Sequence, residues 1–594
     1  MNSVSVSGKN WVLKRYNNEN LLFLKENFSL DEITSKLLSI RGIKKEEVQD
    51  FLNPSIKNSL PNPETLVDME KSCKRTIKAI KNKEKIGILG DYDVDGASST
   101  ALLGNYFSEL NLKYEVYIPD RKKEGYGPSI SAFEKFIEKD VKIIFTLDCG
   151  TLSFKSIEFA KKNGIDVIVL DHHQSEIKLP KAFSIVNPNR FDDKSNLNYL
   201  CAAGVTFMFL VNLNKSLRDI NWFKMSNLDE PQLIDYLDLV SLGTVCDVVP
   251  LTGLNRAIVK QGLKILKNKK NLGLKALIDI CEIDSNPNIY HLGYVLGPRI
   301  NAGGRVGKSS HGANLLLNSN KKEVYKIASE LDNYNKERQL LEHDVLQKVL
   351  DISPSHISDP VLVISGKYWH EGVIGIVASR LKEKFNKPVI IISIENDIGK
   401  ASARSIIGFD IGTNIIAAAQ EKILLKGGGH KMAGGFSIKV ENIEKFKKFI
   451  NRKFEKINED LKKEKPLYLD SVISSSSVNL DFYQKVNNLA PFGSGNPEPK
   501  FLIENLKSVN NKIIKDKHIK SVLIGQDGSK IKAVAFNSVE NEIGAYLLKK
   551  DSNLFNIAGK LSLNEWKGQS NVEFIIDDIS VNKTLKKTVP SSIG

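Results

Sequence analysis

Three aspartates at alternate positions, directly after an apolar run, constrain the fold of this chain more than any other feature. Residues 85–90 (KIGILG) have the composition of a buried strand, and residues 91–96 (DYDVDG) carry the three acids and end in glycine. Residues 97–110 begin with small side chains and then place apolar ones at helical spacing. A buried strand, an acidic turn and a packed helix are typical of an α/β active-site loop, so we expect the carboxylates at the end of a parallel strand.

The same aspartates also match the first half of an EF-hand calcium loop, which is the alternative interpretation. The twelfth position of such a loop holds a bidentate Glu, and here it is Leu102. A helix leads into an EF-hand loop, whereas a predicted strand leads into Asp91. Both departures favour the strand-end site.

Further apolar segments of this region also end in acids or histidines. Residues 142–147 precede Asp148, residues 166–170 precede residues 171–173 (DHH), and residues 241–246 precede Asp247. We expect these segments to be strands of one parallel sheet, separated by helices such as residues 153–162. Because open α/β sheets place their sites at the carboxyl ends of the strands, the acids should meet there.

Such a cluster of carboxylates would repel itself unless divalent cations neutralised it. Mixed carboxylate and imidazole ligands favour Mn²⁺ or Mg²⁺ over zinc. Two ions bridged by a carboxylate can clamp the attacking and leaving oxygens of a phosphoryl group. The sequence therefore predicts metal-assisted hydrolysis of a phosphodiester or a phosphoanhydride.

The ordered set of motifs resembles that of the DHH phosphoesterase superfamily. The motifs are residues 91–96 (DYDVDG), 148–150 (DCG), 171–173 (DHH) and 243–247 (GTVCD). The resemblance implies that the metal ligands are Asp93, Asp95, Asp148, His172 and Asp247, with Asp91 as a further ligand or a close neighbour. It also implies that His173 faces the substrate phosphate as a proton donor or electrostatic stabiliser, and that Asp171 orients the histidines.

Two glycine-rich segments that carry arginine resemble the RecJ branch of this superfamily, which acts on single-stranded DNA. They are residues 118–127 (IPDRKKEGYG) and 296–305 (LGPRINAGGR). Glycine allows close backbone approach and arginine supplies bidentate donors, which together suit phosphate recognition, although either segment alone could be an ordinary turn. The resemblance places Arg121 and Arg305 in a pocket for a terminal 5′-phosphate, together with Ser402 and Arg404 from a later segment. Arg299 and Asn301 are further candidates.

A second α/β unit carries segments that resemble the DHH-associated domain, DHHA1. They are residues 369–380 (WHEGVIGIVASR), 401–405 (ASARS) and 427–435 (GGGHKMAGG). The resemblance implies that substrate phosphate and nucleotide are held by Ser402, Arg404, Gly428, Gly429 and His430. A glycine run lets backbone N–H groups reach an anion, but it can equally reflect close packing.

The C-terminal region has the pattern of a five-stranded OB-fold barrel. The predicted strands are residues 501–509, 518–525, 530–536, 555–563 and 572–579, with a helix over 538–549. Such barrels bind single strands through a basic groove and stacking aromatics, for which the candidates are Phe536, Lys560, Trp566 and Lys567. Aromatic side chains also fill the core of small barrels, so either role is open.

The predicted fold class is α/β, with two α/β domains joined by a long helix and a C-terminal OB-fold barrel. The predicted domains are an N-terminal helical segment (1–80), a DHH catalytic domain (81–320), a connector helix (321–352), a DHHA1 substrate-binding domain (353–465), an OB-fold single-strand-binding domain (466–582) and a tail (583–594).

The amino-acid composition indicates which class of molecule the protein binds and in which cellular compartment it occurs. The 85 basic and 70 acidic residues leave a net charge of +15, which suits a polyanion such as nucleic acid. The five cysteines are scattered without paired spacing, which argues for reduced thiols. No leader-like segment and no long apolar stretch is present, so we expect a cytoplasmic protein that binds no membrane.

The resemblance covers residues 40–580 and implies a 5′→3′ exonuclease that degrades single-stranded DNA to 5′-mononucleotides in recombination and repair. It implies two Mn²⁺ or Mg²⁺ ions, a monomer, and a helicase and a single-strand-binding protein as candidate partners. One alternative is a small-substrate enzyme of the same superfamily that cleaves oligoribonucleotides, cyclic dinucleotides or pyrophosphate. The other is an inactive scaffold that binds single strands, although all the expected ligands are present.

Overall fold

The computed structural model describes residues 3–121, 123–456, 466–549, 554–566 and 569–582. The chain divides into two compact units. The larger comprises residues 62–247 and 262–463, and the smaller comprises residues 1–61, 248–261 and 464–594. Among the described residues, no helix has both the length and the apolar character needed to cross a membrane.

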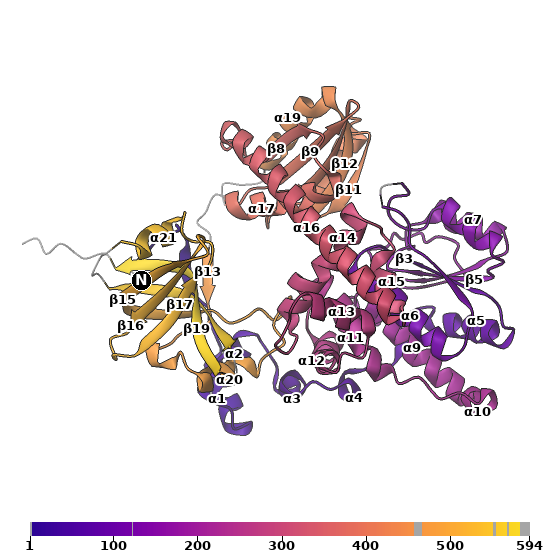
Figure 1. The fold of residues 1–594 in the computed structure, drawn as a ribbon, viewed down its shortest axis with the longest axis horizontal. Helices are drawn as coiled ribbons and strands as arrows, with labels where there is room; N and C mark the ends of the chain where they lie inside the picture. Colours follow the sequence, from indigo (N-terminus) through magenta and orange to yellow (C-terminus); the bar gives the residue numbers. More distant parts are fainter. Residues whose placement is uncertain (1–2, 122, 457–465, 550–553, 567–568, 583–594) are drawn as a thin grey trace, which may run out of the picture. The chain divides into compact units, whose positions relative to one another are not determined.

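The larger unit contains a five-stranded sheet in which all neighbouring strands are parallel (Figure 1). In spatial order the strands are β4 (Tyr114–Tyr117), β3 (Ile86–Gly90), β5 (Ile143–Leu147), β6 (Asp166–Leu170) and β7 (Ser184–Val186). Every residue of β3 and β5 is buried, which explains their unbroken apolar sequences.

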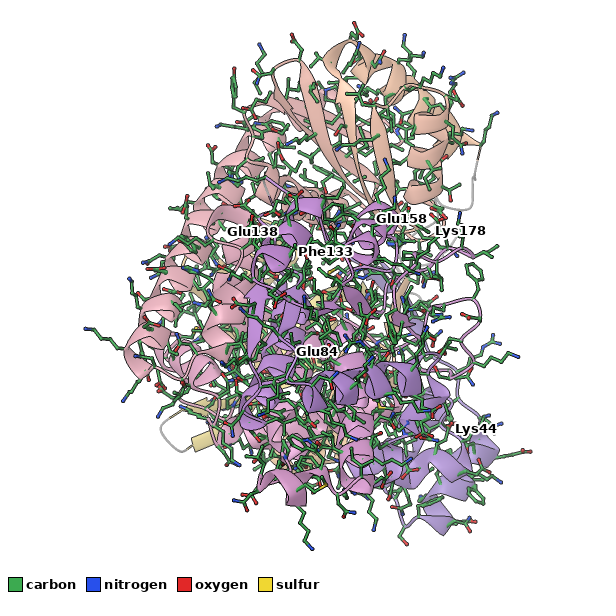
Figure 2. The ribbon with its side chains drawn as sticks, turned by 90° about the vertical axis from the view of Figure 1, so that its right-hand side faces the viewer. Lys44, Glu84, Phe133, Glu138, Glu158 and Lys178 are labelled. Atoms are coloured by element: carbon green, nitrogen blue, oxygen red, sulfur yellow. The ribbon has the colours of Figure 1, made fainter. Side chains whose placement is uncertain are left out.

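Helices cover both faces of this sheet. They are α5 (Met69–Lys81), α6 (Val94–Glu109), α7 (Ile130–Glu138), α8 (Phe154–Lys162) and α9 (Ala202–Asp219). On one face, Phe133 of α7 packs into a core shared with α8, and the carboxylates of Glu138 and Glu158 lie at the surface (Figure 2). On the other face, the ring of Phe145 in β5 contacts the ring of Phe107 in α6 at a centroid distance of 5.6 Å.

Further helices follow the sheet along the chain, and one of them occupies a segment that was predicted to be a strand. They are α10 (Trp222–Ser226), α11 (Leu237–Cys246), α12 (Gly253–Lys267), α13 (Leu272–Ile280), α14 (Gly297–Val306) and α15 (His311–Leu317), and a π-helix over His291–Leu296 leads into α14. The segment before Asp247 was expected to be a strand, and it is helix α11. Its residues Leu237 to Thr244 are all buried, and a continuous apolar run does not distinguish an enclosed helix from a buried strand.

The long helix α16 (Lys321–Ile352) joins this α/β domain to a second one (Figure 1). The strands of the second sheet, in spatial order, are β11 (Lys426–His430), β12 (Ala433–Lys439), β10 (Ile398–Arg404), β9 (Val389–Glu395) and β8 (Leu362–Lys367). Its helices are α17 (Glu371–Phe385), α18 (Ile411–Gln420) and α19 (Ile443–Glu455). Strands β8 and β9 are parallel, and the other neighbours are antiparallel.

The smaller unit contains a closed five-stranded barrel, as predicted for residues 466–582. Its strands are β15 (Phe501–Ile514), β16 (His518–Ile524), β17 (Lys530–Ala535), β18 (Phe555–Trp566) and β19 (Gln569–Asn582). The barrel closes because β18 pairs with both β15 and β19. The helices α20 (Leu480–Asn487) and α21 (Glu542–Leu547) accompany it.

The first residues of the chain belong to the same unit as the barrel. Strand β1 (Ser3–Ser5) pairs with β19, and β2 (Asn10–Leu13) pairs with β13 (Pro466–Leu469). The helices that follow are α1 (Asn18–Asn27), α2 (Glu32–Ile40), α3 (Val48–Leu52) and α4 (Ile56–Ser59). Leu24 and Leu37 from these helices share a buried core with Phe501 of the barrel. The segment expected to be helical therefore also contains strands, and it packs with residues more than 400 positions away.

Candidate active site

The register of the parallel sheet brings three of the predicted acids together. Asp91, Asp148 and Asp171 each follow the last residue of a strand, and those last residues are paired across β3, β5 and β6. The backbone N–H of Asp91 donates to the carbonyl of Leu147, and that of Asp148 donates to the carbonyl of Leu170. The three side chains are buried, with exposed fractions of 4%, 2% and 1%.

The start of helix α6 supplies two more carboxylates. Asp93 caps the helix by accepting a hydrogen bond from the backbone N–H of Gly96 at 3.0 Å. Asp95 lies in the first turn, and its carboxylate accepts the backbone N–H groups of Ala202 and Ala203, at 2.6 and 3.0 Å, where α9 begins. A side chain at Gly96 would place its Cβ 2.6 Å from the carbonyl oxygen of Asp91, so the turn requires glycine.

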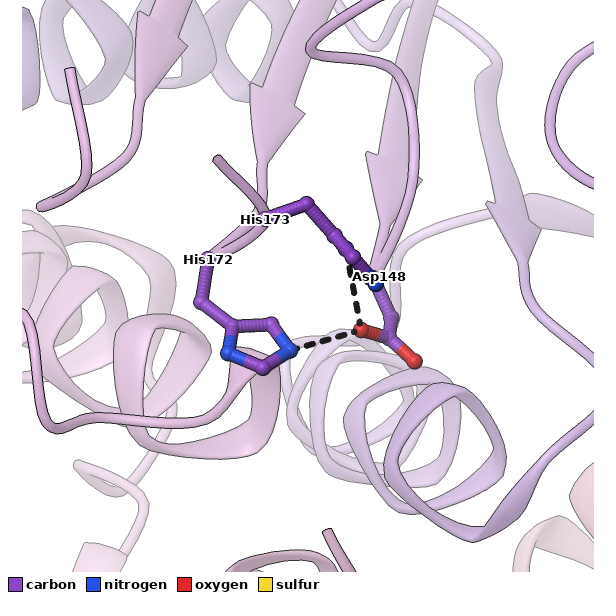
Figure 3. Close-up of side chains that lie close together, drawn as sticks. All are labelled: Asp148, His172 and His173. Atoms are coloured by element: carbon purple, nitrogen blue, oxygen red, sulfur yellow. Dashed lines mark ion pairs between the residues drawn. The ribbon is translucent and has the colours of Figure 1, made fainter. Parts of the chain in front are cut away.

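The histidine pair lies between these acids, as Figure 3 shows for Asp148, His172 and His173. Nε2 of His172 is 3.3 Å from Oδ1 of Asp148, 3.6 Å from Oδ2 of Asp247 and 3.8 Å from Oδ2 of Asp95. Helix α11 therefore brings Asp247 to the site from outside the sheet. Nδ1 of His173 is 2.8 Å from Oδ1 of Asp171 and 3.8 Å from Oδ1 of Asp148.

The carboxylates of this cluster have strongly perturbed acidities. Burial, and then the charges of neighbouring aspartates, raise the pKa of Asp148 and of Asp91 well above the usual range. Burial, with the nearby Asp95, raises the pKa of Asp247 to about 8. The Oδ1 atoms of Asp91 and Asp148 are buried and accept no hydrogen bond from any described residue. These carboxylates are therefore positioned to bind cations rather than to accept hydrogen bonds from the protein.

The predicted ligands form groups compact enough to hold metal ions. The groups are Asp91 with Asp93 and Asp148, Asp95 with His172 and Asp247, and Asp148 with His172 and His173, each with its ligand atoms within 4.8 Å of one another. The oxygen-rich donor set suits Mn²⁺ or Mg²⁺.

His173 is held by neighbours that favour its charged form. Burial lowers the pKa of His173, but the hydrogen bond and charge of Asp171 outweigh it and raise the pKa to about 9. Asp171 remains a carboxylate: burial raises its pKa, but hydrogen bonds from His173 and Thr151 and the charge of His173 hold it below its usual value. Asn187 donates to the carbonyl oxygen of His173 at 2.8 Å, which fixes the backbone of the pair.

Tyr126 also touches His173, and the sequence interpretation assigned it no role. Its hydroxyl donates to the carbonyl oxygen of Asp148 at 2.8 Å and lies 3.1 Å from Nδ1 of His173. The two rings meet edge to face with centroids 5.6 Å apart. The flanking Gly125 and Gly127 have φ of +84° and +80°, and this glycine pair was the available indication of an unusual turn.

The structure brings together the arginines predicted to bind phosphate. Burial, followed by repulsion from Arg121, Arg338 and Arg404, lowers the pKa of Arg305 to about 10. Tyr92 directly follows Asp91, and the Arg121 guanidinium lies over its ring, 5.2 Å from the centroid. The sequence interpretation missed Arg338, because it lies in the connector helix α16 where polar residues were taken as a solvated face.

Ser402 and Arg404 join this group from strand β10. Nη1 of Arg404 donates to Oγ of Ser402 at 3.2 Å and to the carbonyl oxygen of Ala403 at 2.8 Å. A Cβ at Gly375 of α17 would lie 2.9 Å from Oγ of Ser402 and 3.1 Å from the Arg404 guanidinium. The glycine therefore keeps space beside these two side chains.

Arg299 and Asn301 have different surroundings. The Arg299 guanidinium donates to Oδ1 of Asp332 and to the carbonyl oxygen of Val295, each at 2.8 Å, so it braces α14 against α16. Asn301 is half-buried, one helical turn before Arg305, and therefore lies on the same side of α14.

The glycine run lies in the same sheet as Ser402 and Arg404, with strand β12 between them. Gly428 aligns with Gly435 of β12, which aligns with Ser402, and His430 aligns through Ala433 with Arg404. Neighbouring strands lie about 4.8 Å apart, so the two segments are roughly 10 Å from one another. A Cβ at Gly412 would lie 2.7 Å from the backbone of Gly429, so these two glycines pack closely. A Cβ at Gly428 would meet nothing within 4 Å.

Family models match most of the chain. A model described as the DHH family, N-terminal domain, matches residues 85–244, a DHHA1 domain model matches residues 358–456, and a RecJ OB domain model matches residues 469–578. Their order is that of the predicted domains.

Curated relatives extend this similarity over nearly the full length. The chain is 31% identical to the single-stranded-DNA-specific exonuclease RecJ of Bacillus subtilis, over 96% of this chain and 71% of that protein. It is 33% identical to the exonuclease of the same name from Escherichia coli, over 93% of this chain and 96% of that protein. A crystal structure of RecJ with Mn²⁺ from Thermus thermophilus matches 96% of this chain and 79% of that chain, with 26% identity and a TM-score of 0.80. The chain therefore belongs to the RecJ family of the DHH superfamily.

Proposed function

We propose that this protein is a 5′→3′ exonuclease that degrades single-stranded DNA to 5′-mononucleotides by metal-dependent phosphodiester hydrolysis, in DNA recombination and repair. One observation carries the proposal: the carboxylates of Asp95, Asp148 and Asp247 surround His172, and the guanidinium of Arg121 lies close by, over the ring of Tyr92. Relatives that share most of the chain are named as single-stranded-DNA-specific exonucleases.

Two Mn²⁺ or Mg²⁺ ions fit the acidic cluster. The group of Asp91, Asp93 and Asp148 and the group of Asp95, His172 and Asp247 together contain all the expected ligands. When bound, such ions polarise a phosphoryl oxygen and lower the pKa of water. The Thermus thermophilus RecJ structure was determined with Mn²⁺.

His173 is proposed to face the scissile phosphate. The hydrogen bond and the charge of Asp171 favour the protonated ring, which can donate a hydrogen bond or a proton to a phosphate oxygen. Asp171 orients the ring through Nδ1, and Tyr126 braces it from a second direction.

The arginine group is proposed to bind the terminal 5′-phosphate. Arg121, Arg305 and Arg404 would hold this phosphate, because their positive charges repel one another until an anion neutralises them, and the hydroxyl of Ser402 would donate a further hydrogen bond. Asn301 is a further candidate on the same side of α14, and Arg299 would position that helix. Gly428, Gly429 and His430 would contact the adjoining nucleotide with exposed backbone and imidazole.

The barrel is proposed to bind the strand further from the cleaved end. Phe536 is 54% exposed, so its ring is available for base stacking. Lys560 pairs with Glu498, and the side chains of Trp566 and Lys567 lie outside the described residues. A helicase and a single-strand-binding protein as partners, a monomeric state and a cytoplasmic location stay predictions.

The decisive experiment follows hydrolysis of a long single-stranded DNA with a 5′-phosphate, in Mn²⁺ and in EDTA. Sequential release of mononucleotides from the 5′ end, absent with EDTA and on blunt duplex, is the expected result. Binding without cleavage would contradict the proposal and support an inactive scaffold. Cleavage confined to dinucleotides would support a small-substrate enzyme.

A further inference from the structure

Two tyrosine rings lie exposed and stacked on the surface of the larger unit. Tyr290 directly precedes the π-helix His291–Leu296, and Tyr294 lies within it. Their ring centroids are 5.5 Å apart with an interplanar angle of 22°, and the residues are 61% and 74% exposed. Large aromatic rings that remain in water as an adjacent pair mark an interaction surface more often than a structural element.

The local structure holds both rings outward. Leu292 and Leu296 of the same π-helix are fully buried, so the opposite side of the helix is the one that packs on the protein. The backbone N–H of Asn288 donates to Nδ1 of His291, and the backbone N–H of His291 donates to Oδ1 of Asn288. These reciprocal bonds fix the start of the segment, and short π-helical turns occur frequently at functional sites.

The π-helix packs directly on the element that ends at the acidic cluster. Sγ of Cys246 is 3.4 Å from the carbonyl oxygen of Leu292, and Cys246 immediately precedes Asp247. A Cβ at Gly297, the first residue of α14, would lie 2.5 Å from that sulfur, which shows how closely the start of α14 approaches α11. The π-helix then continues into α14, which carries Arg305. The tyrosine pair therefore belongs to the same packed elements as a predicted metal ligand and a predicted phosphate-binding arginine.

We propose that Tyr290 and Tyr294 form a stacking platform for a base of the single strand whose phosphate is held in the active site. The two rings stack on one another, so a base can extend the stack on an outward ring face, and every base has a face that stacks regardless of sequence. A nucleic acid is favoured over a protein partner because the π-helix that carries Tyr294 packs on α11, which ends at Asp247, and continues into α14, which carries Arg305. The inference rests on the proposed function and adds a substrate subsite to it.

The test compares the Tyr290→Ala/Tyr294→Ala variant with the Tyr290→Phe/Tyr294→Phe variant, which keeps both rings. Binding of single-stranded DNA to the full-length chain is measured in EDTA, so that no turnover occurs. The alanine variant should lose roughly tenfold in affinity, and the phenylalanine variant should match the wild type. Unchanged affinity of the alanine variant overturns the platform.

A strand with a single abasic residue, moved along the sequence, gives a second test that needs no variant. The wild-type protein should bind more weakly when the abasic residue occupies one particular position, and the alanine variant should be insensitive at that position. The rings do not hold a base if the abasic residue weakens binding of the wild type at no position. The same conclusion follows if the affinity lost through the abasic residue and the affinity lost through the alanine substitutions are additive. Hydrolysis in Mn²⁺ is followed separately: its absence overturns the exonuclease proposal, while the binding results still decide the platform.

Discussion

Asp148 is the residue on which the acidic cluster converges. It belongs to two of the three potential metal-binding groups, it is 2% exposed, and its backbone has φ of +61°. We expect Asp148→Asn to reduce cleavage by roughly a hundredfold or more while single-strand binding is retained, because the arginines and the barrel are unchanged. Single-turnover cleavage and equilibrium binding to the same labelled strand measure the two effects.

A matched control for this substitution is Asp140→Asn. Asp140 also has a positive φ, of +56°, but its carboxylate is exposed and pairs with Lys142. This variant should cleave like the wild type. Without added metal, Asp148→Asn should also melt at a higher temperature than the wild type, because it removes one of several buried carboxylates that repel one another. Full cleavage by Asp148→Asn would contradict the metal-cluster model.

Asp238 is a buried carboxyl at the start of α11, outside the proposed ligand set. It is 2% exposed, and burial raises its pKa to about 7. An unfolded Asp ionises near pH 3.9, so the native state retains a proton that the unfolded state loses as the pH rises from about 4 to 7. Stability therefore falls over this window, by about 1.4 kcal/mol per pH unit at most.

Replacing this carboxyl by an amide should remove that loss. We expect Asp238→Asn to be more stable than the wild type at pH 7, with a difference that shrinks toward zero near pH 4. Melting temperatures from pH 4 to 8 measure the trend. A difference that does not change with pH would show that Asp238 titrates normally in the folded protein.

At the scale of elements, Glu342 links the connector helix α16 to the second α/β domain. Its carboxylate is 2% exposed, accepts a hydrogen bond from Arg338 of the same helix at 2.6 Å and forms an ion pair with Arg380 of α17. Glu342→Ala would leave the buried Arg338 with no carboxylate partner, and only its hydrogen bonds to Asn335 would remain. We expect the free energy of unfolding to fall by about 2–3 kcal/mol, which is less than for a fully buried pair because the Arg380 side chain is more than half exposed. Without Glu342 the Arg338 guanidinium would no longer be held in place near Arg305, so KM should rise for strands with a 5′-phosphate.

The same helix provides the comparison for this prediction. Asp344 pairs with Lys348 at 2.7 Å, but both side chains are 56% exposed. Asp344→Ala should therefore change stability by less than about 0.5 kcal/mol and leave KM unchanged. Equal losses in the two variants, measured as denaturation midpoints, would show that Glu342 acts only as a surface charge.

For the whole molecule, the smaller unit is assembled from three separate stretches of chain. Arg256, which is 2% exposed, donates to the carbonyl oxygens of Phe51, Leu489, Ala490 and Pro491 and thus joins all three. Removing residues 466–594 would uncover Leu24 and Leu37 and leave β1 and β2 without partners. We expect this truncated chain to aggregate, as measured by light scattering. A second truncation that also lacks residues 1–61 should aggregate less, because the exposed apolar residues are removed with it. If the chain that lacks only residues 466–594 were stable and monomeric, this description of the smaller unit would be wrong.

Local patterns were sufficient to predict the three acids at the ends of β3, β5 and β6 and the five strands of the barrel. Asp91, Asp148 and Asp171 follow apolar strands whose length, composition and turn residues are properties of adjacent residues. Parallel register then places the ends of such strands together whatever the rest of the chain does. The long helix α16 was likewise evident from its uninterrupted helical sequence.

Contacts between distant residues determined the rest. The segment before Asp247 is a helix whose residues 237–244 are all buried, and a continuous apolar run has no periodicity that distinguishes it from a buried strand. Tyr126 reaches His173, Arg338 joins Arg305, and β1 pairs with β19 only after separate parts of the chain have packed. The free energies of such contacts depend on burial and on neighbouring charges, which a one-dimensional pattern does not specify.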